Sequence, residues 1–293
     1  MGMLVSVTCG VLGCFLVVRR MALLGDAVSH AVLPGLVLAF VFSGSYGALA
    51  MGIGAVAAGL LSTVLIEGIH RNSRIKQDAS LGIVLTALFS LGVVLINLLA
   101  GKAHLDQECV LYGEIAFVPL QAAVDVLGLA VPEPVVHMAV VMLLIMLGIV
   151  LFYKELLITS FDPQLADSLG IRSSRIHYGL MAALSLTVVS SFESVGAILV
   201  VAMLIVPGAT AFLLASRLHW MLALAAVHGF LSTATGLVLA VQWDCSIAAA
   251  MVIAGAGLFL LAVIFSPRFG LFSRAFRRRQ LRNHAAREGL HVA

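Results

Sequence analysis

Residues 195–215 read VGAILVVAMLIVPGATAFLLA, a run of 21 residues without a charge. About 20 apolar residues in a helix span the hydrocarbon core of a bilayer, so this run predicts a membrane-spanning helix. Pro207 is expected to kink that helix, because a proline frees a backbone carbonyl. Similar runs recur along the chain, and we count nine, at roughly 3–18, 27–43, 46–66, 79–100, 135–153, 178–192, 195–215, 219–241 and 247–265.

The composition of the chain agrees with a membrane protein. Of its 293 residues, 62% are hydrophobic and 11% are charged, and the mean hydropathy is +1.14. These values exclude a soluble enzyme, a disordered chain and a fibrous repeat. The apolar runs do not alternate with polar residues, which favours helices over a barrel. The predicted fold is an all-α, polytopic transmembrane bundle. Because three of the nine runs are short, we expect eight or nine spans.

The positions of the basic residues predict the orientation of this bundle. When nine segments alternate across the membrane, all Lys and Arg residues except Lys102 fall on one side, which we assign to the cytoplasm. The N-terminus is then outside and the C-terminus inside. The four cysteines form no CxxC pair, so the sequence predicts neither a disulfide framework nor a thiolate metal site.

Three regions of the chain are too polar to span. Residues 101–134 are expected to form an outer loop with an interfacial helix, and residues 154–177 form the longest cytoplasmic loop between spans. The predicted membrane-spanning domain covers residues 1–265. Residues 266–293 form a basic cytoplasmic tail, which we expect to lie on anionic lipid.

The most informative stretch is RRMALLGDAVSHAVLPG, residues 19–35. Asp26 and His30 are spaced i, i+4, which puts both side chains on one face of a helix. At about 1.5 Å per residue, Asp26 lies ~9 Å and His30 ~15 Å from Arg20 along the helix axis. Half of a ~30 Å hydrocarbon core is ~15 Å, so His30 is expected near the midplane. Ionisable groups at this depth are costly and indicate function.

A carboxylate and an imidazole suit a divalent cation such as zinc, manganese or ferrous iron. Two ligands make an incomplete shell, and a two-fold pair of chains would supply two Asp and two His. A structural pair and a proton relay are the alternatives. A broken helix next to the pair is allowed by Gly25, Pro34 and Gly35.

Other residues are weaker candidates for function. Glu193 lies at an outer junction between two helices, and its candidate roles are an outer gate, a receptor contact or a solvated loop acid. His228 is a lone histidine in a span, where a hydrogen bond across helices is the usual finding. Close helix packing is predicted by Gly52, Ala55 and Gly59.

The cytoplasmic loop contains a short predicted helix. Asp162 and Pro163 resemble an N-cap followed by a proline in the first turn, and Gly170 is expected to end the helix. The chain has no GxxxxGK[ST] phosphate loop, so active transport would require a partner or an ion gradient. This loop is the expected contact for a cytoplasmic partner, and an ordinary surface loop is the alternative.

These motifs resemble the membrane permeases of ABC-type zinc, manganese and iron importers. The resemblance covers about residues 5–272. It rests on the 19–35 stretch together with DASLGI (78–83), VLYGEI (110–115), LLITSFDPQLADSLGI (156–171), SVGAILVVAMLIVPGATA (194–211) and FSPRFG (265–270). Members of that family usually carry additional residues before the position of Met1, so the first helix is expected to be shortened.

The resemblance implies a transporter with several components. Two permease subunits, identical or related, would form the pore in a bacterial cytoplasmic membrane. Two cytoplasmic ATPase subunits would drive it, and an extracytoplasmic metal-binding protein would deliver Zn²⁺, Mn²⁺ or Fe²⁺. No permanently bound cofactor, catalytic residue or nucleic acid is implied. The family's metal site maps onto Asp26 and His30, and its ATPase-coupling loop maps onto Asp162, Pro163, Ala166 and Gly170.

Two other functions remain compatible with the residues themselves. A proton-coupled secondary metal transporter would use Asp26 and His30 as a relay. A membrane scaffold or sensor would transport nothing.

Overall fold

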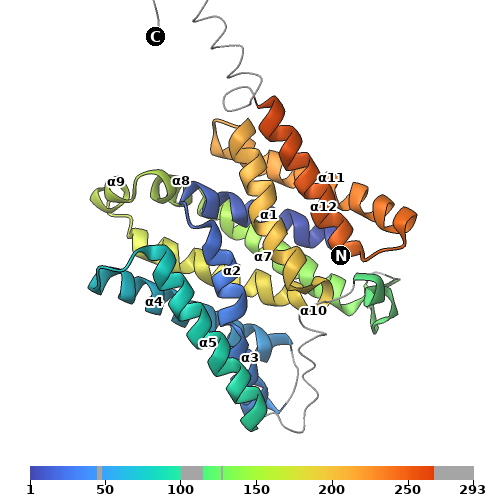
Figure 1. Cartoon of the computed structure of the whole chain (residues 1–293), viewed down its shortest axis with the longest axis horizontal. Helices are drawn as coiled ribbons and strands as arrows, with labels where there is room; N and C mark the ends of the chain where they lie inside the picture. Colours follow the sequence, from blue (N-terminus) through green and yellow to red (C-terminus); the bar gives the residue numbers. More distant parts are fainter. Residues whose placement is uncertain (45–47, 100–114, 127, 267–293) are drawn as a thin grey trace, which may run out of the picture.

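The computed structural model describes residues 1–44, 48–99, 115–126 and 128–266, and these form a bundle of helices (Figure 1). Long apolar stretches without alternation form helices here because a helix satisfies its own backbone hydrogen bonds. The elements are α1 (Gly2–Val18), α2 (Ala22–Ala31), α3 (Leu33–Ser43), α4 (Ala48–Asn72), α5 (Gln77–Leu99), η1 (Ile115–Leu120), β1 (Ala123–Val126), β2 (Leu129–Pro132), α7 (Glu133–Leu151), α8 (Tyr153–Phe161), α9 (Pro163–Ser168), α10 (Ser173–Leu214), α11 (Leu218–Trp243) and α12 (Ile247–Phe265).

The number of spans differs from the prediction. In the described residues, seven helical stretches are long and apolar enough to cross a membrane: Ala22–Ser43, Ala50–Asn72, Gln77–Leu98, Glu133–Leu151, Ser194–Leu214, Leu218–Trp243 and Ile247–Phe265. The expected eight or nine spans are therefore not confirmed. Helix α1 is apolar but short, and the segment 178–192 is part of α10 instead of a helix of its own.

Helix α10 is interrupted at Gly196 and not at Pro207. Gly196 has φ 75° and ψ 162°, values outside the helical region and accessible in practice to glycine alone. The chain keeps helical dihedral angles at Pro207. The kink expected at Pro207 stays a prediction, and a glycine eleven residues earlier divides this helix into two parts.

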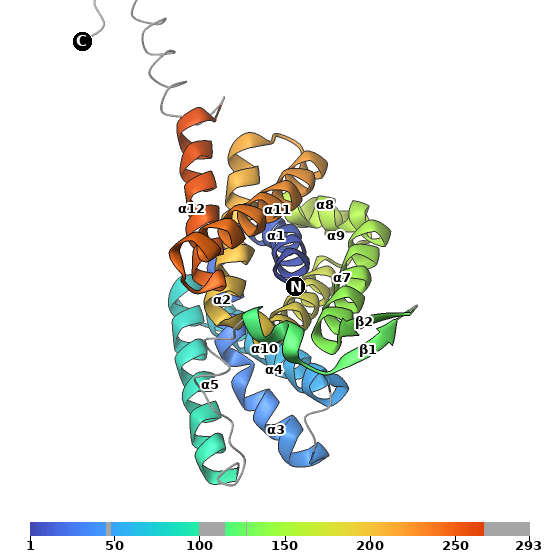
Figure 2. The same ribbon diagram turned by 90° about the vertical axis from the view of Figure 1, so that its right-hand side faces the viewer.

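Helix α1 lies in the middle of the bundle. Figure 2 shows it nearly end-on, with α7, α10 and α11 around it. The approach to α10 is close because both helices carry glycine at the crossing, where Gly13 faces the backbone of Leu204 and Gly208 faces the backbone of Gly13. The side chains of Cys9, Cys14 and Phe15 on α1 are fully buried.

Small residues also bring other helices together, as predicted. Gly59 of α4 lies against Ser185 of α10, so closely that a methyl group on Gly59 would overlap with the serine side chain. Gly35 of α3 and Gly54 of α4 face each other through their backbones. Close approach of this kind allows van der Waals contact between helix backbones in a membrane.

The predicted outer loop has a different local structure from the expected one. Where residues 101–134 are described, they form the 3₁₀ helix η1 and a hairpin of β1 and β2, in which Val124 pairs with Val131. The expected interfacial helix is therefore wrong for residues 115–132. The tail at 267–293, with its predicted role on lipid, lies outside the described residues.

Local contacts join some of the predicted inner connections to one another, and some of the predicted outer connections to one another. Residues of the connections after α1, α4 and α8 line one pocket, and Ile115 shares another pocket with Asp244 and Cys245. The hydroxyl of Ser266 donates to the carbonyl of Leu213, which joins two further predicted inner connections. The side of the membrane on which each of these connections lies stays a prediction.

Candidate metal site

Asp26 and His30 lie one turn apart on α2, as their spacing predicts. Oδ1 of Asp26 is 3.5 Å from Nε2 of His30. Both residues belong to the apolar stretch Ala22–Ser43, so the pair lies within a segment able to span a membrane. The structure therefore brings a carboxylate and an imidazole together among apolar helices.

The remaining faces of α2 are buried in the bundle. Leu24, Ala27 and Val28 are almost fully covered, and α2 packs against α4, α5 and α10. The pair lies on the less covered side, where the side chains of Asp26 and His30 remain 43% and 31% exposed. This chain alone therefore leaves space for a further group beside the pair.

His30 lies against an aromatic ring and close to the end of its helix. Its ring meets the ring of Phe89 on α5 edge to face, with 5.6 Å between the ring centroids. The helix is interrupted two residues later at Val32, and Pro34 occupies the first turn of α3. Pro34 has no N–H to donate to the carbonyl of His30, which explains why α2 ends here. The expected broken helix is confirmed.

The pair by itself is an incomplete metal site. Within the described ranges, no group of three or more His, Cys, Asp or Glu side chains is arranged to hold a metal ion. A divalent ion takes four or more ligands, so an ion bound at this pair would need further ligands from water or from a second chain. The half-exposed position of Asp26 and His30 is compatible with this requirement.

The short helix predicted in the 154–177 loop is present as α9. Asp162 is its N-cap, and the Asp162 carboxylate accepts a hydrogen bond of 3.0 Å from the N–H of Leu165. Pro163 occupies the first helical position, where its missing N–H costs no helical bond. The side chain of Ala166 is fully buried, so one face of α9 rests on the bundle.

Gly170 ends α9 as predicted, with φ +83°. The N–H of Ile171 donates to the carbonyl of Ala166, and the N–H of Gly170 donates to that of Asp167. This pair of bonds is the Schellman arrangement that closes many helices. Asp167 then accepts two hydrogen bonds from Ser173, from its N–H at 2.9 Å and from its hydroxyl at 3.1 Å. The four-residue connection to α10 is therefore well ordered.

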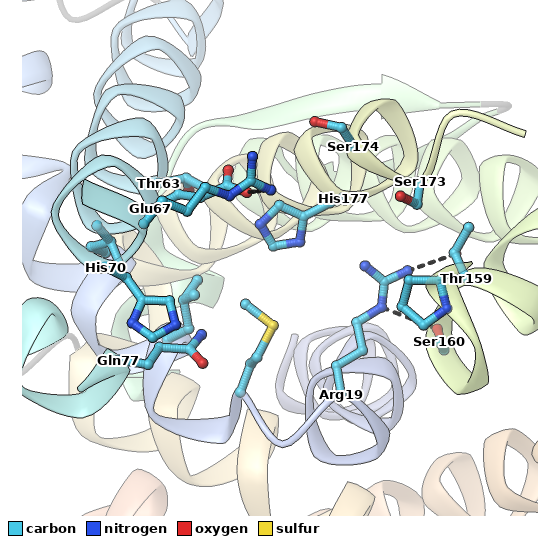
Figure 3. A pocket seen from close by; sticks show the side chains of 15 residues that line it. Arg19, Thr63, Glu67, His70, Gln77, Thr159, Ser160, Ser173, Ser174 and His177 are labelled. Atoms are coloured by element: carbon cyan, nitrogen blue, oxygen red, sulfur yellow. Dashed lines mark hydrogen bonds and ion pairs between the residues drawn. The ribbon is translucent and has the colours of Figure 1, made fainter. Parts of the chain in front are cut away.

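A polar pocket of about 360 Å³ lies beside α9. Figure 3 shows the side chains of Arg19, Glu67, His70 and His177 around it. Glu67 accepts a hydrogen bond of 2.6 Å from the Tyr178 hydroxyl and forms an ion pair with Arg71. Burial lowers the pKa of His177 below its ordinary value, and the nearby Arg19 cation lowers it further.

Two predictions about single residues have different outcomes. The backbone of Glu193 belongs to α10, but its side chain lies outside the described part of the structure, so its role as an outer gate stays a prediction. His228 on α11 is buried, and within the described residues its Nε2 has no hydrogen-bond partner. The expected bond from this atom across helices is not found.

The structure adds two contacts that sequence reasoning missed. Phe89 restricts His30, and Arg19 binds the hydroxyls of Thr159 and Ser160 on α8. The arginine was used only to predict orientation. Its position seven residues before Asp26, at the start of the 19–35 stretch, was the available signal for a second role.

Seven helical stretches long and apolar enough to cross a membrane, counted in the described residues, define the class of multi-pass membrane proteins. The chain belongs to the ABC 3 transport family, whose model matches residues 1–266. It is a membrane permease of the ABC-type divalent-metal transporter family, which confirms the resemblance seen in the sequence motifs.

Known transport proteins match nearly the whole length of this chain. The manganese transport system membrane protein MntD of Bacillus subtilis is 46% identical over 277 residues, covering 94% of this chain and 93% of that protein. The zinc transport system membrane protein TroD of Treponema pallidum is 43% identical over 278 residues, covering 95% and 76%. The fold is similar to that of PsaBC from Streptococcus pneumoniae in complex with Fab, with a TM-score of 0.77, 34% identity and coverage of 95% and 92%.

Proposed function

We propose that this chain is the permease subunit of an ATP-driven importer of divalent transition metal ions in a bacterial cytoplasmic membrane. The observation that carries the proposal is the Asp26–His30 pair, 3.5 Å apart and half-exposed within a spanning segment. An ionisable pair at membrane depth is costly to maintain without a function. Membership of a family with metal transporters supports this function.

The ligand chemistry points to a borderline metal ion as the cargo. Carboxylate oxygen and imidazole nitrogen suit zinc, manganese and ferrous iron, whereas copper(I) prefers sulfur ligands. A second permease subunit, identical or related, would face the exposed side of α2 and complete the shell with its own Asp and His. The names of the relatives include both manganese and zinc, so the proposal is made for the class of ion.

The source of energy in the proposal is a separate pair of ATPase subunits. The chain lacks a GxxxxGK[ST] phosphate loop, and α9 offers a capped and mostly exposed short helix at the end of the bundle that we assign to the cytoplasm. An extracytoplasmic metal-binding protein would deliver the ion at the opposite end. The proposed mechanism is alternating access, in which movement of α9 opens the metal site toward the cytoplasm.

The test is metal uptake into proteoliposomes. They would contain this permease, its ATPase and its binding protein, with zinc, manganese and iron in competition. The variants are Asp26→Asn and His30→Gln, with Asp78→Asn as a control, because Asp78 lies in the first turn of α5 away from the pair. We expect ATP-dependent uptake by the wild type and the control, and a loss of about tenfold or more in each pair variant, since each removes one ligand.

Two outcomes would contradict the proposal. Wild-type uptake in Asp26→Asn, at equal abundance in the membrane, would show that the pair does not bind the cargo. Uptake driven by a pH gradient without ATP would favour the proton-coupled secondary transporter, in which Asp26 and His30 relay protons.

A further inference from the structure

Arg19 connects the end of α1 to the end of α8. Its Nε donates to Oγ of Ser160 at 3.1 Å, and its Nη2 donates to Oγ1 of Thr159 at 3.0 Å (Figure 3). Thr159 and Ser160 are buried. Only Phe161 separates Ser160 from Asp162, the N-cap residue of α9. A single side chain therefore joins the helix that precedes the metal pair to the helix that precedes α9.

The contact between Arg19 and these hydroxyls is charge-assisted. Burial lowers the pKa of Arg19 to about 10, so its guanidinium remains charged at neutral pH. The hydroxyl of Thr159 donates to the carbonyl of Glu155 at 2.7 Å, which directs its lone pairs toward the guanidinium. Hydrogen bonds from an ionised donor are roughly twice as strong as neutral ones, and bonded chains reinforce one another.

Glu67 across the pocket does not compete for the guanidinium. Its carboxylate is already held by Arg71 and by the hydroxyl of Tyr178. In the part of the chain that the structure describes, Arg19 forms no ion pair with any carboxylate. Its side chain is therefore committed to α8.

The connection from Arg19 to the metal pair contains no loose segment. The N–H of Met21 donates to the carbonyl of Leu16 at 2.8 Å, and Arg20 adopts φ 59° between them, which closes α1 as a Schellman motif. The carbonyl of Met21 then accepts from the N–H of Leu24 at 3.0 Å, in the first turn of α2. A displacement of Arg19 is thus transmitted to α2 through hydrogen-bonded backbone.

The connection from Ser160 to α9 is equally tight. The N–H of Asp162 donates to the carbonyl of Ile158 at 2.8 Å, and the Asp162 carboxylate caps α9. The α8–α9 corner therefore moves together with Thr159 and Ser160.

We propose that Arg19 is the positioning residue through which movement of α9 changes the position of the Asp26–His30 helix. The inference rests on the proposed function, because it assigns the transmission step of the same transport cycle. The hydrogen bonds of the Arg19 side chain go to α8 and not to the Asp26–His30 pair. It acts by holding α8 and α2 in register, so that a displacement of α9 reaches the metal ligands.

The test separates transmission from binding and from stability. The variants are Arg19→Gln and the double variant Thr159→Val with Ser160→Ala, which remove the two ends of the same contact. Arg74→Gln is the matched control, because Arg74 is an exposed arginine of the α4–α5 connection. Metal uptake, ATP hydrolysis with and without cargo, and equilibrium metal binding are measured on the complete complex, with thermal unfolding as a check of folding.

We expect Arg19→Gln to lower uptake by about tenfold, which corresponds to losing one charge-assisted contact of about 1.4 kcal/mol in the cycle. Stimulation of ATP hydrolysis by cargo should be lost, while equilibrium metal binding stays within about twofold because both ligands remain. The double variant Thr159→Val with Ser160→Ala should show the same loss of uptake and of stimulation by cargo, and the same unchanged metal binding. Combining it with Arg19→Gln should add little further loss, since both changes remove the same contact.

Three results would decide against the inference. Normal uptake in Arg19→Gln at equal abundance overturns it. Loss of metal binding in parallel with uptake, or rescue of uptake by lowering the temperature alone, would show that Arg19 only supports the fold. If the wild-type complex takes up no metal with ATP, the proposed function itself fails, and this outcome is distinct from a variant that matches an active wild type.

Discussion

Gly13 of α1 faces the carbonyl group of Leu204 on α10 so closely that a methyl group on Gly13 would overlap with the Leu204 oxygen. Neither backbone can move easily, because both helices are buried at this crossing. The close approach of α1 and α10 therefore requires glycine, which has only a hydrogen atom as its side chain, at position 13.

We expect Gly13→Ala to destabilise the protein by about 1–3 kcal/mol, the usual cost of overpacking a close contact. The measurement is the midpoint of thermal unfolding in detergent. Gly148→Ala on α7 is the matched control, because no atom lies within 4 Å of its added methyl group. Alanine in a helix interior is favoured over glycine by about 0.8–1.0 kcal/mol, so the control should be neutral or stabilising. Equal midpoints for the two variants would contradict the close crossing.

Gly170 gives a second prediction, about the end of α9. Its φ of +83° is unfavourable for any residue with a Cβ, and no neighbouring atom lies within 4 Å, so backbone conformation alone decides the effect. Gly170→Ala should destabilise the end of α9 by about 1–2 kcal/mol. Faster amide hydrogen exchange at Ile171 would report it. Gly179→Ala, in the interior of α10 and equally free of neighbours, should leave this exchange rate unchanged.

The Asp167–Ser173 contact predicts how the α9–α10 connection depends on pH. The N–H and hydroxyl of Ser173 lower the pKa of Asp167 below its ordinary value of 3.8. The contact is therefore complete above that value and is lost only as the pH falls through the lowered pKa. Amide exchange at Ser173 should be protected at neutral and mildly acidic pH alike. Asp167→Ala should remove that protection at every pH, and a wild-type change near neutrality would argue against the carboxylate.

His228 gives a prediction of opposite sign. Its imidazole is buried on α11, and in the described residues its Nε2 lacks a hydrogen-bond partner. Replacing an unsatisfied polar group with an apolar one of similar size removes a desolvation cost, so His228→Leu should stabilise the protein by about 1–2 kcal/mol. Thermal unfolding measures this change. A variant that unfolds like the wild type but loses metal uptake would instead place His228 in transport.

Acid should slow metal uptake if Asp26 and His30 bind the cargo. Both ligands bind a metal only when they are deprotonated, so protons compete with the ion. We expect the metal concentration needed for half-maximal uptake to rise as the pH is lowered, with a smaller change in maximal rate. Uptake that increases with external acid would contradict metal ligation and support proton coupling.

Local signals in the sequence predicted the local parts of this structure well. The cap at Asp162, the end of α9 at Gly170 and the shared face of Asp26 and His30 each depend on residues within a few positions of one another. Spacing along a helix fixes such relationships before any tertiary contact forms. The break in the helix beside Pro34 followed from the same kind of local rule.

Relationships between distant parts of the chain were not available from one sequence. The bond from Arg19 to Ser160 spans 141 positions, and no local pattern marks the two as partners. The interruption at Gly196 was missed because proline is the stronger local signal, although Pro207 continues the helix.

The break at Gly196 divides α10 into two helical parts joined at a kink. A straight helix of 42 residues would be about 63 Å long at 1.5 Å per residue, twice the ~30 Å thickness of the hydrocarbon core. Ser185, before the break, packs against Gly59 of α4, and Leu204, after the break, packs against Gly13 of α1. If α10 were straight at Gly196, one of its two parts would lose its contact with the neighbouring helix. The backbone conformation of Gly196 thus allows α10 to contact Gly59 of α4 and Gly13 of α1 at the same time.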